Sequence, residues 1–165
     1  MSNINIWPKQ SECLGLFGNP SEHNFVSKHL VLITPPFFMH MGKIPIKHFY
    51  MNKICASSIE RILNKAWEIC EKNQEKIAKE HFDKFSGSWA VRPMRGKKNT
   101  ISMHAYGLAI DFHAEKNPLG RKPGGNIQSF TENSLLVKLF KEENWTWGGN
   151  WSGRPDGMHF QAARV

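Results

Sequence analysis

Apolar and polar residues follow two different rhythms along this chain, and each rhythm predicts a different kind of element. Between Asn52 and Phe82, apolar side chains recur every three or four residues, which predicts one long amphipathic helix. The apolar stripe of this helix consists of Ile54, Ile59, Ile62, Leu63, Ala66, Ile69 and Cys70. A second pattern of the same period predicts a shorter helix from Ser129 to Glu142.

The second rhythm is an alternation of period two, which is typical of strands with one buried face. It predicts a strand within Ile101 to His113, with Asp111 on the side opposite the apolar residues. It also predicts a closing strand from Gly157 to Ala162 and a strand-like segment from Ser88 to Met94. Pro93 to Gly96 is expected to form a turn after that segment.

These elements predict an α+β fold, in which helices pack on one small and mostly antiparallel sheet. The chain has 165 residues, so we expect a single domain over residues 1–165. Residues 1–45 are rich in glycine, proline and aromatic residues and are expected to be irregular, with short strands near Val31 to Thr34. The main folded core is expected over residues 50–162, with a loop over residues 117–126.

Composition narrows the classes of protein to which the chain can belong. Hydrophobic residues make up 40% of it, enough for a packed core, yet no run reaches the roughly 18 apolar residues of a membrane span. The formal net charge is +8, which suits an anionic partner. No nucleic-acid-binding motif accompanies this charge, so nucleic acid is not an expected partner. The N-terminus lacks the features of a signal peptide, so we expect synthesis in the cytoplasm.

Two histidines and one aspartate carry the spacing of a candidate metal site. His104 and Asp111 are seven residues apart, and Gly107 between them allows the chain to turn so that both point at one place. His159 comes from a distant strand and is the expected third ligand. Two imidazoles and one carboxylate leave a metal ion with open positions, and Zn²⁺ is the ion that best suits this mixture of nitrogen and oxygen ligands.

Other polar residues near these three have expected roles in catalysis. Asp156 precedes His159 by three residues and is predicted to be a general base that later protonates the leaving amine. Arg92 is predicted to bind a substrate carboxylate or carbonyl, and Arg95 is a second candidate for this role. His113 is expected to be an ordinary surface residue, with an alternative role as a ligand or as a group that orients one.

Further side chains are candidates for contact with substrate. Ser102 is expected to donate or accept a hydrogen bond within the site, and Tyr106 could bond the substrate directly or simply pack in the core. Trp147 could line a substrate cleft or serve the core, as could its neighbours Trp145 and Trp151. Gln161 shares a strand face with His159 and is expected to orient it.

The combined motifs resemble those of the VanY-type D-Ala-D-Ala carboxypeptidases and of the L-Ala-D-Glu endopeptidases that bacteriophages use as endolysins. The matching residues are Ser102, His104, Gly107, Ala109 and Asp111, then Trp147-Gly148-Gly149-Asn150-Trp151, and finally Asp156, Met158, His159 and Phe160. The resemblance implies a hedgehog/DD-peptidase-like fold, one Zn²⁺ bound by His104, Asp111 and His159, and Asp156 as the catalytic base. Gly157 departs from the family pattern, where proline is common.

The resemblance leads to a functional hypothesis and to rivals. We expect a monomeric zinc peptidase that hydrolyses a bond in the stem peptide of bacterial peptidoglycan, specifically the L-Ala-D-Glu bond. Such an endopeptidase would act on the cell wall after release from the cytoplasm, as a bacteriolytic lysis enzyme of the phage type. One alternative is a D-Ala-D-Ala carboxypeptidase. An alternative of another class is a non-catalytic zinc-binding module, which a fourth protein ligand such as His113 would favour.

Overall fold

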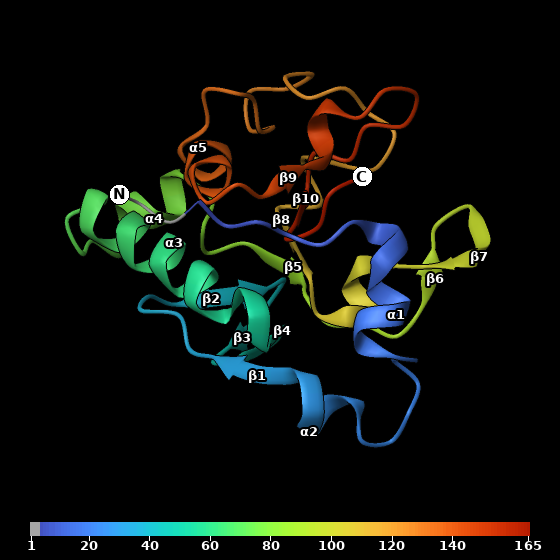
Figure 1. Cartoon of the computed structure of the whole chain (residues 1–165). Coiled ribbons are helices and arrows are strands. Elements are labelled where there is room, and N and C mark those ends of the chain that lie inside the picture. The colour runs from blue at the N-terminus through green and yellow to red at the C-terminus, as the bar shows by residue number, and fades with distance from the viewer. Residues whose placement is uncertain (1–3) are drawn as a thin grey trace.

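A computed structural model describes residues 4–165 and has an α+β architecture (Figure 1). Its centre is a four-stranded antiparallel sheet with the strand order β5-β8-β10-β9, accompanied by the two-stranded antiparallel sheets β1-β4, β2-β3 and β6-β7. The described strands are β1 (Leu30–Ile33), β2 (Met39–Met41), β3 (Ile44–Ile46), β4 (Phe49–Asn52), β5 (Phe85–Gly87), β6 (Pro93–Met94), β7 (Lys97–Ile101), β8 (Ala109–Phe112), β9 (Thr146–Trp147) and β10 (His159–Gln161).

Short and medium-length helices surround these sheets. The described α-helices are α1 (Cys13–Phe17), α2 (Phe25–His29), α3 (Ala56–Ile69), α4 (Gln74–Lys79) and α5 (Leu135–Glu142). The described 3-10 helices are η1 (Gln10–Glu12), η2 (Lys53–Cys55), η3 (Met103–Tyr106) and η4 (Gly148–Asn150). Within residues 4–165, no helix combines the length and the apolar character needed to cross a bilayer.

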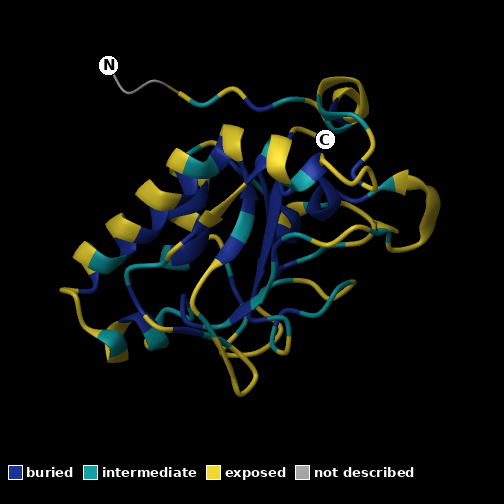
Figure 2. Ribbon diagram, turned by 90° about the horizontal axis from the view of Figure 1, so that it is seen from below, coloured by how far each residue is buried: buried dark blue, intermediate teal, exposed yellow. Residues whose placement is uncertain are grey.

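The core lies between the central sheet and the helices α3 and α5, which contact each other. Phe140 of α5 packs on Phe160 of β10 with ring centroids 4.6 Å apart, and Phe112 of β8 lies 5.9 Å from Phe140. All four residues of β8 are buried, so both faces of this strand are covered and Asp111 lies inside the protein. The outer faces of the helices remain exposed, as Figure 2 shows.

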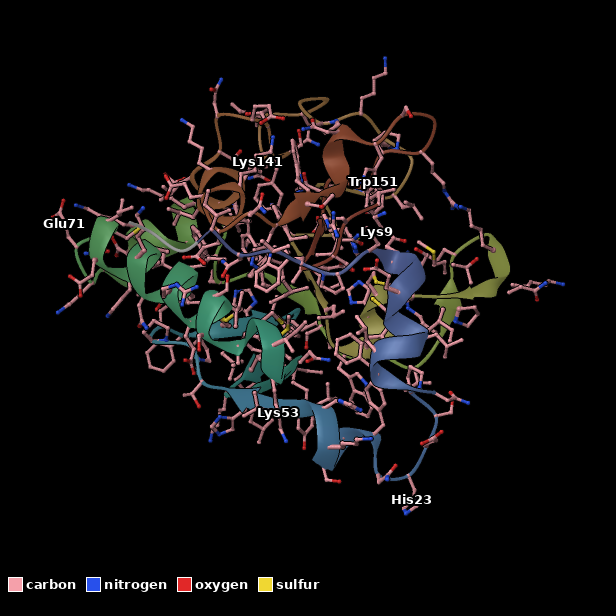
Figure 3. All side chains as sticks on the ribbon, viewed as in Figure 1. Lys9, His23, Lys53, Glu71, Lys141 and Trp151 are labelled. Carbon is pink, nitrogen blue, oxygen red and sulfur yellow. The ribbon has the colours of Figure 1, made fainter. Side chains whose placement is uncertain are left out.

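The long helix that the sequence predicts over Asn52 to Phe82 is divided into α3 and α4. The chain leaves the helical conformation at Glu71 and Lys72, whose φ angles are +57° and +52°. Glu71 lies at the outer tip of α3 (Figure 3). A new helix then begins after Asn73, whose side chain accepts a hydrogen bond from the backbone N–H of Lys76. Two successive left-handed residues and a new N-cap therefore end the predicted helix.

The second predicted helix also has different limits, because α5 begins at Leu135 and not at Ser129. The preceding residues form a turn in which Thr131 N donates to Ser134 Oγ at 2.9 Å and Ser134 N donates to Thr131 O at 3.0 Å. Side-chain oxygens that bond nearby backbone groups compete with helix formation, which explains the late start.

The predicted strands are shorter than their alternating patterns indicate. Within Ser88 to Met94 only β6 is a strand, because Ala90 N bonds the carbonyl of His104 instead of a neighbouring strand. The segment Ile101 to His113 is interrupted by η3, which ends at Gly107 with a φ of +69°. The turn that glycine permits there separates His104 from the strand that carries Asp111.

The N-terminal segment is more regular than its glycine- and proline-rich sequence indicates, since it forms α1, α2, β1, β2 and most of β3. Its strand β1 pairs with β4, which in turn supports η3 directly. Asn52 N donates to Gly107 O at 2.8 Å, and the Asn52 side chain donates to Tyr106 O at 3.0 Å. A Cβ atom on Gly107 would lie 2.6 Å from a methyl carbon of Leu30. The N-terminal half therefore packs tightly against the turn that follows His104.

Candidate metal centre and active-site groove

Three side chains from two strands and a 3-10 helix converge on one buried point. Strands β8 and β10 are antiparallel neighbours in which Asp111 faces His159, so both side chains lie on the same side of the sheet. Helix η3 places His104 beside them. The Asp111 Oδ1 atom lies 3.1 Å from His159 Nδ1 and 3.2 Å from His104 Nε2, and the two nitrogens are 3.2 Å apart. The convergence that the spacing predicts is therefore present.

Hydrogen bonds on the far side of each imidazole fix which ring nitrogen faces this point. His104 Nδ1 donates to the carbonyl of Ser88 at 2.5 Å, which leaves Nε2 with its lone pair toward the centre. His159 Nε2 donates to Gln161 Oε1 at 2.9 Å, which leaves Nδ1 with its lone pair toward the same place. The Gln161 amide is itself held because its Nε2 donates to Ala163 O at 3.1 Å.

The resulting donor set suits a cation. Two imidazole lone pairs and one carboxylate oxygen meet within hydrogen-bonding distance, and a positive ion between them satisfies all three. Burial alone would raise the pKa of Asp111, but the contacts with His104 and His159 outweigh it and hold that pKa below its usual range. Burial alone would lower the pKa of His159, but Asp111 outweighs it and raises that pKa. Two nitrogen ligands and one oxygen ligand match the composition of catalytic zinc sites.

Asp156 lies next to this group in a protected position. Its Oδ1 atom is buried and has no hydrogen-bond partner within residues 4–165. Its backbone N–H donates to Gly148 O at 2.8 Å, and its carbonyl accepts from His159 N at 3.2 Å. Burial raises the pKa of the Asp156 carboxyl, and the nearby Asp111 carboxylate raises it further. A partly desolvated carboxyl with a free oxygen is suited to accept and release a proton.

These residues line an open groove of about 350 Å³. Arg92, Arg95 and Ser102, which the sequence predicts to contact substrate, line it too, and that role stays a prediction. Ser102 Oγ also accepts a hydrogen bond from His104 N at 3.3 Å and thereby caps η3. The ring of Trp151, which Figure 3 shows beside η4, lies 5.3 Å from the ring of His159 and forms part of the wall.

The structure does not bring Tyr106 and Trp147 into the groove. Tyr106 is only 2% exposed and packs on the ring of Phe25 from the N-terminal segment. Trp147 is 3% exposed, and its Nε1 atom donates to Gly157 O at 2.9 Å, so it supports the loop that carries Asp156. The sequence left two roles open for each of these aromatic side chains, packing in the core or contact with substrate. The structure assigns both of them to packing.

His113 lies apart from the three converging side chains. Its ring stacks on His81 with a centroid distance of 4.4 Å, and burial lowers its pKa to about 4. The group of metal-ligating atoms within reach of one another consists of His104, Asp111 and His159 alone among the described residues.

Several contributors to the site carry no clear signal in the sequence. Ser88 acts through its backbone carbonyl, which any residue would provide. Gly148 permits a close approach, since a Cβ there would lie 2.6 Å from Asp156 O. The glycine pair before Trp151 could have indicated such a contact, whereas the role of Ser88 depends on the fold alone.

Comparison with known proteins agrees with this geometry. No curated protein and no solved structure matches the chain. Residues 95–162 match the family model described as D-alanyl-D-alanine carboxypeptidase, and this range contains His104, Asp111, Asp156 and His159. Over residues 95–162 the chain therefore resembles the VanY-type zinc peptidases, and this resemblance supports a metallopeptidase of the kind that acts on peptidoglycan.

Proposed function

We propose that this protein is a zinc-dependent endopeptidase that hydrolyses the L-Ala–D-Glu bond in the stem peptide of bacterial peptidoglycan and serves as a phage-type lysis enzyme. The observation that carries the proposal is the triangle of acceptor atoms from His104, Asp111 and His159, with the unpartnered Asp156 carboxyl beside it in an open groove. The family match supports the reaction class and the general substrate.

His104 Nε2, Asp111 Oδ1 and His159 Nδ1 would hold the zinc ion. A bound zinc ion would supply Lewis acidity, which lowers the pKa of water to about 7 and polarises the scissile carbonyl. The protein's own contribution is to fix the ligand atoms: Ser88 O and Gln161 Oε1 hold both imidazoles with their lone pairs inward.

Proton transfer falls to Asp156. Its free Oδ1 atom accepts a proton from the attacking water and returns that proton to the nitrogen of the leaving amine. A raised pKa favours this double role, because the carboxyl must be both a base and an acid in one cycle. Arg92 lines the groove, and in this proposal it would donate hydrogen bonds to the carbonyl oxygen as negative charge develops there.

The choice between endopeptidase and carboxypeptidase depends on how much chain the groove accepts. Its lining includes residues of the β6-β7 hairpin together with Leu119, Trp151, Ser152 and Arg154, and a lining built from such distant segments favours a peptide that continues beyond the scissile bond. The description of the matching family favours the second candidate, removal of a terminal D-Ala. A non-catalytic zinc module is less well supported, because His113 does not supply a fourth ligand.

The test is mass spectrometry of purified peptidoglycan after digestion. The protein is compared as purified, after treatment with a chelator, and after zinc is added back. We expect products with a new D-Glu amino terminus that disappear with chelator and return with zinc. Loss of a single D-Ala residue instead would establish the carboxypeptidase.

The lysis role has a separate readout. Added to permeabilised bacteria of the susceptible wall type, the protein should lower the turbidity of the suspension. Cleavage of isolated peptidoglycan without any fall in turbidity would leave the peptidase assignment intact and remove the lysis role. Protein that holds zinc but yields no product from any wall type would establish the non-catalytic module.

A further inference from the structure

The rim of the groove carries positive charge that the protein itself does not neutralise. Arg92, Arg95, Lys97 and Arg154 all line the groove. None of them forms a salt bridge with a carboxylate among the described residues, although pairs such as Arg61–Glu143 occur elsewhere on the surface. Unpaired cations around a reaction site indicate that the ligand carries the complementary negative charge.

Arg154 connects the two walls of the groove. It belongs to the loop between η4 and β10, and its Nη1 atom donates to Arg95 O at 3.1 Å on the β6-β7 hairpin. It lies so close to the hairpin tip that a Cβ on Gly96 would come within 2.8 Å of the same nitrogen. The guanidinium is thus held at the mouth of the groove and retains further N–H donors for a ligand.

The position of this guanidinium relative to Asp156 defines which part of a substrate it can reach. Arg154 precedes Asp156 by two residues, and Arg95, Arg154 and Asp156 all line the same groove. In the proposed mechanism Asp156 delivers a proton to the leaving amine. The substrate residue that carries this amine must therefore lie beside Asp156, with its α-carbon substituents among these cations.

We propose that Arg154, together with Arg95, binds a free α-carboxylate on the substrate residue that follows the scissile bond. This inference rests on the proposed function and specifies its substrate class. In a stem peptide, D-Glu continues the chain through its side-chain carboxyl, so its α-carboxylate is free and lies two bonds from the leaving nitrogen. A terminal D-Ala has the same arrangement. The two parallel N–H donors of a guanidinium match the two oxygens of an α-carboxylate. An α-carboxamide carries no negative charge and cannot replace the carboxylate in this contact.

Binding of the cleavage product tests this without requiring turnover. The probe is a short peptide that begins with D-Glu linked through its side-chain carboxyl, prepared with either a free α-carboxylate or an α-carboxamide. Calorimetric titration into zinc-loaded protein should give a dissociation constant roughly tenfold lower for the acid than for the amide, as expected for one charge-assisted contact at a partly exposed site. The variant Arg154→Gln should bind both peptides with the same weak affinity.

Control variants separate ligand binding from a structural role of Arg154. Lys98→Gln removes one positive charge from the same hairpin at a residue outside the groove lining, and it should keep the preference for the acid. Arg154→Lys should restore part of this preference, because it keeps the charge without the fork. Equal weakening of acid and amide in Arg154→Gln would show that the residue only anchors the hairpin, and would overturn the inference.

Cleavage assays on the same proteins keep the inference distinct from the proposed function. Uncleaved peptides containing L-Ala–D-Glu, with and without the α-amide, are compared with a peptide ending in D-Ala-D-Ala. Preference for the acid in binding, with cleavage only of the D-Ala terminus, would refute the endopeptidase and retain the role of Arg154. Absence of measurable product binding, or equal binding of acid and amide to the unsubstituted protein, would refute that role whatever bond is cleaved.

Discussion

At the scale of single residues, the site depends on neighbours that never touch a substrate. His159 presents Nδ1 to the centre because its opposite nitrogen, Nε2, donates a hydrogen bond to Gln161 Oε1, and the fully buried Gln161 is held by the bond from its amide to Ala163 O. The sequence could suggest only that Gln161 shares a face with His159. The structure shows the hydrogen bond that makes this neighbour matter.

Replacing Gln161 should weaken metal binding without removing a ligand. Gln161→Met keeps the volume but removes the acceptor, so His159 can place its proton on the inward nitrogen. We expect zinc affinity, measured by competition with a chromogenic chelator, to fall roughly 10- to 100-fold. His159→Ala is the reference for complete loss of zinc. An unchanged affinity in Gln161→Met would show that the tautomer is fixed by other contacts.

Asp156 should be separable from the metal ligands by substitution. Asp156→Asn preserves the shape of the side chain but cannot take up a proton, so kcat should fall by roughly two to four orders of magnitude. Zinc content, measured by elemental analysis, should remain at that of the unsubstituted protein. Full activity in this variant would remove Asp156 from the mechanism.

At the scale of elements, the loop from η4 to β10 holds Asp156 by close backbone contacts. Gly148 O accepts from Asp156 N, and a Cβ on Gly148 would lie 2.6 Å from Asp156 O and 3.1 Å from Asp156 Cβ. If a Cβ were present on Gly148, this close contact would force the backbone of Gly148 or of Asp156 to move. The position of the catalytic carboxyl therefore depends on a glycine.

Gly148→Ala should lower activity more than it changes zinc binding. A displacement of the carboxyl by about 1 Å can reduce kcat by up to roughly a hundredfold. Gly15→Ala is the matched control, because it lies in α1 and has nothing within 4 Å of the added Cβ. We expect that control to keep full activity. Equal activity of both variants in a peptide hydrolysis assay would contradict the proposed dependence on Gly148.

The limits of prediction from sequence also follow from individual elements. The alternation around Ile110 and the separation of His104, Asp111 and His159 predicted strands that share a site, and β8 and β10 confirm this. The break at Glu71 and Lys72 could not be predicted, because both residue types are good helix formers and nothing in the local sequence signals the left-handed conformations that they adopt. For the same reason, aromatic residues such as Tyr106 and Trp147 could not be divided between core and groove beforehand.

At the scale of the whole molecule, stability is expected to depend on histidines that the fold keeps neutral. Burial lowers the pKa of His81, and the nearby Lys84 lowers it further, while Asp83 and Glu80 act in the opposite direction. His81 also stacks on His113. A folded-state pKa below the unfolded value means that the unfolded chain binds more protons in this pH range, so stability falls as the solution becomes more acidic.

His81→Asn should reduce this acid sensitivity. Asparagine does not titrate here, and it tolerates the left-handed backbone of this position, where φ is +64°. The contribution of His81 is fully present above about pH 6.5 and is lost as the pH falls toward its lowered folded-state pKa. Urea denaturation at pH 7.5, 6.0 and 5.0 should show a smaller loss of unfolding free energy for the variant. Parallel curves for both proteins would refute the assignment to His81.

The bond from His104 to Ser88 has a consequence for how this protein could be recombined. The range that matches the family, 95–162, contains every proposed ligand but begins seven residues after Ser88, whose carbonyl orients His104. It also omits β5 and Asn52, which secure β8 and the turn after η3. A graft of that range into another scaffold would transfer the ligands without their orientation. The segment that must be transferred to keep the site intact is thus larger than the segment that carries the recognisable motif. Chimeras should therefore be joined upstream of β1.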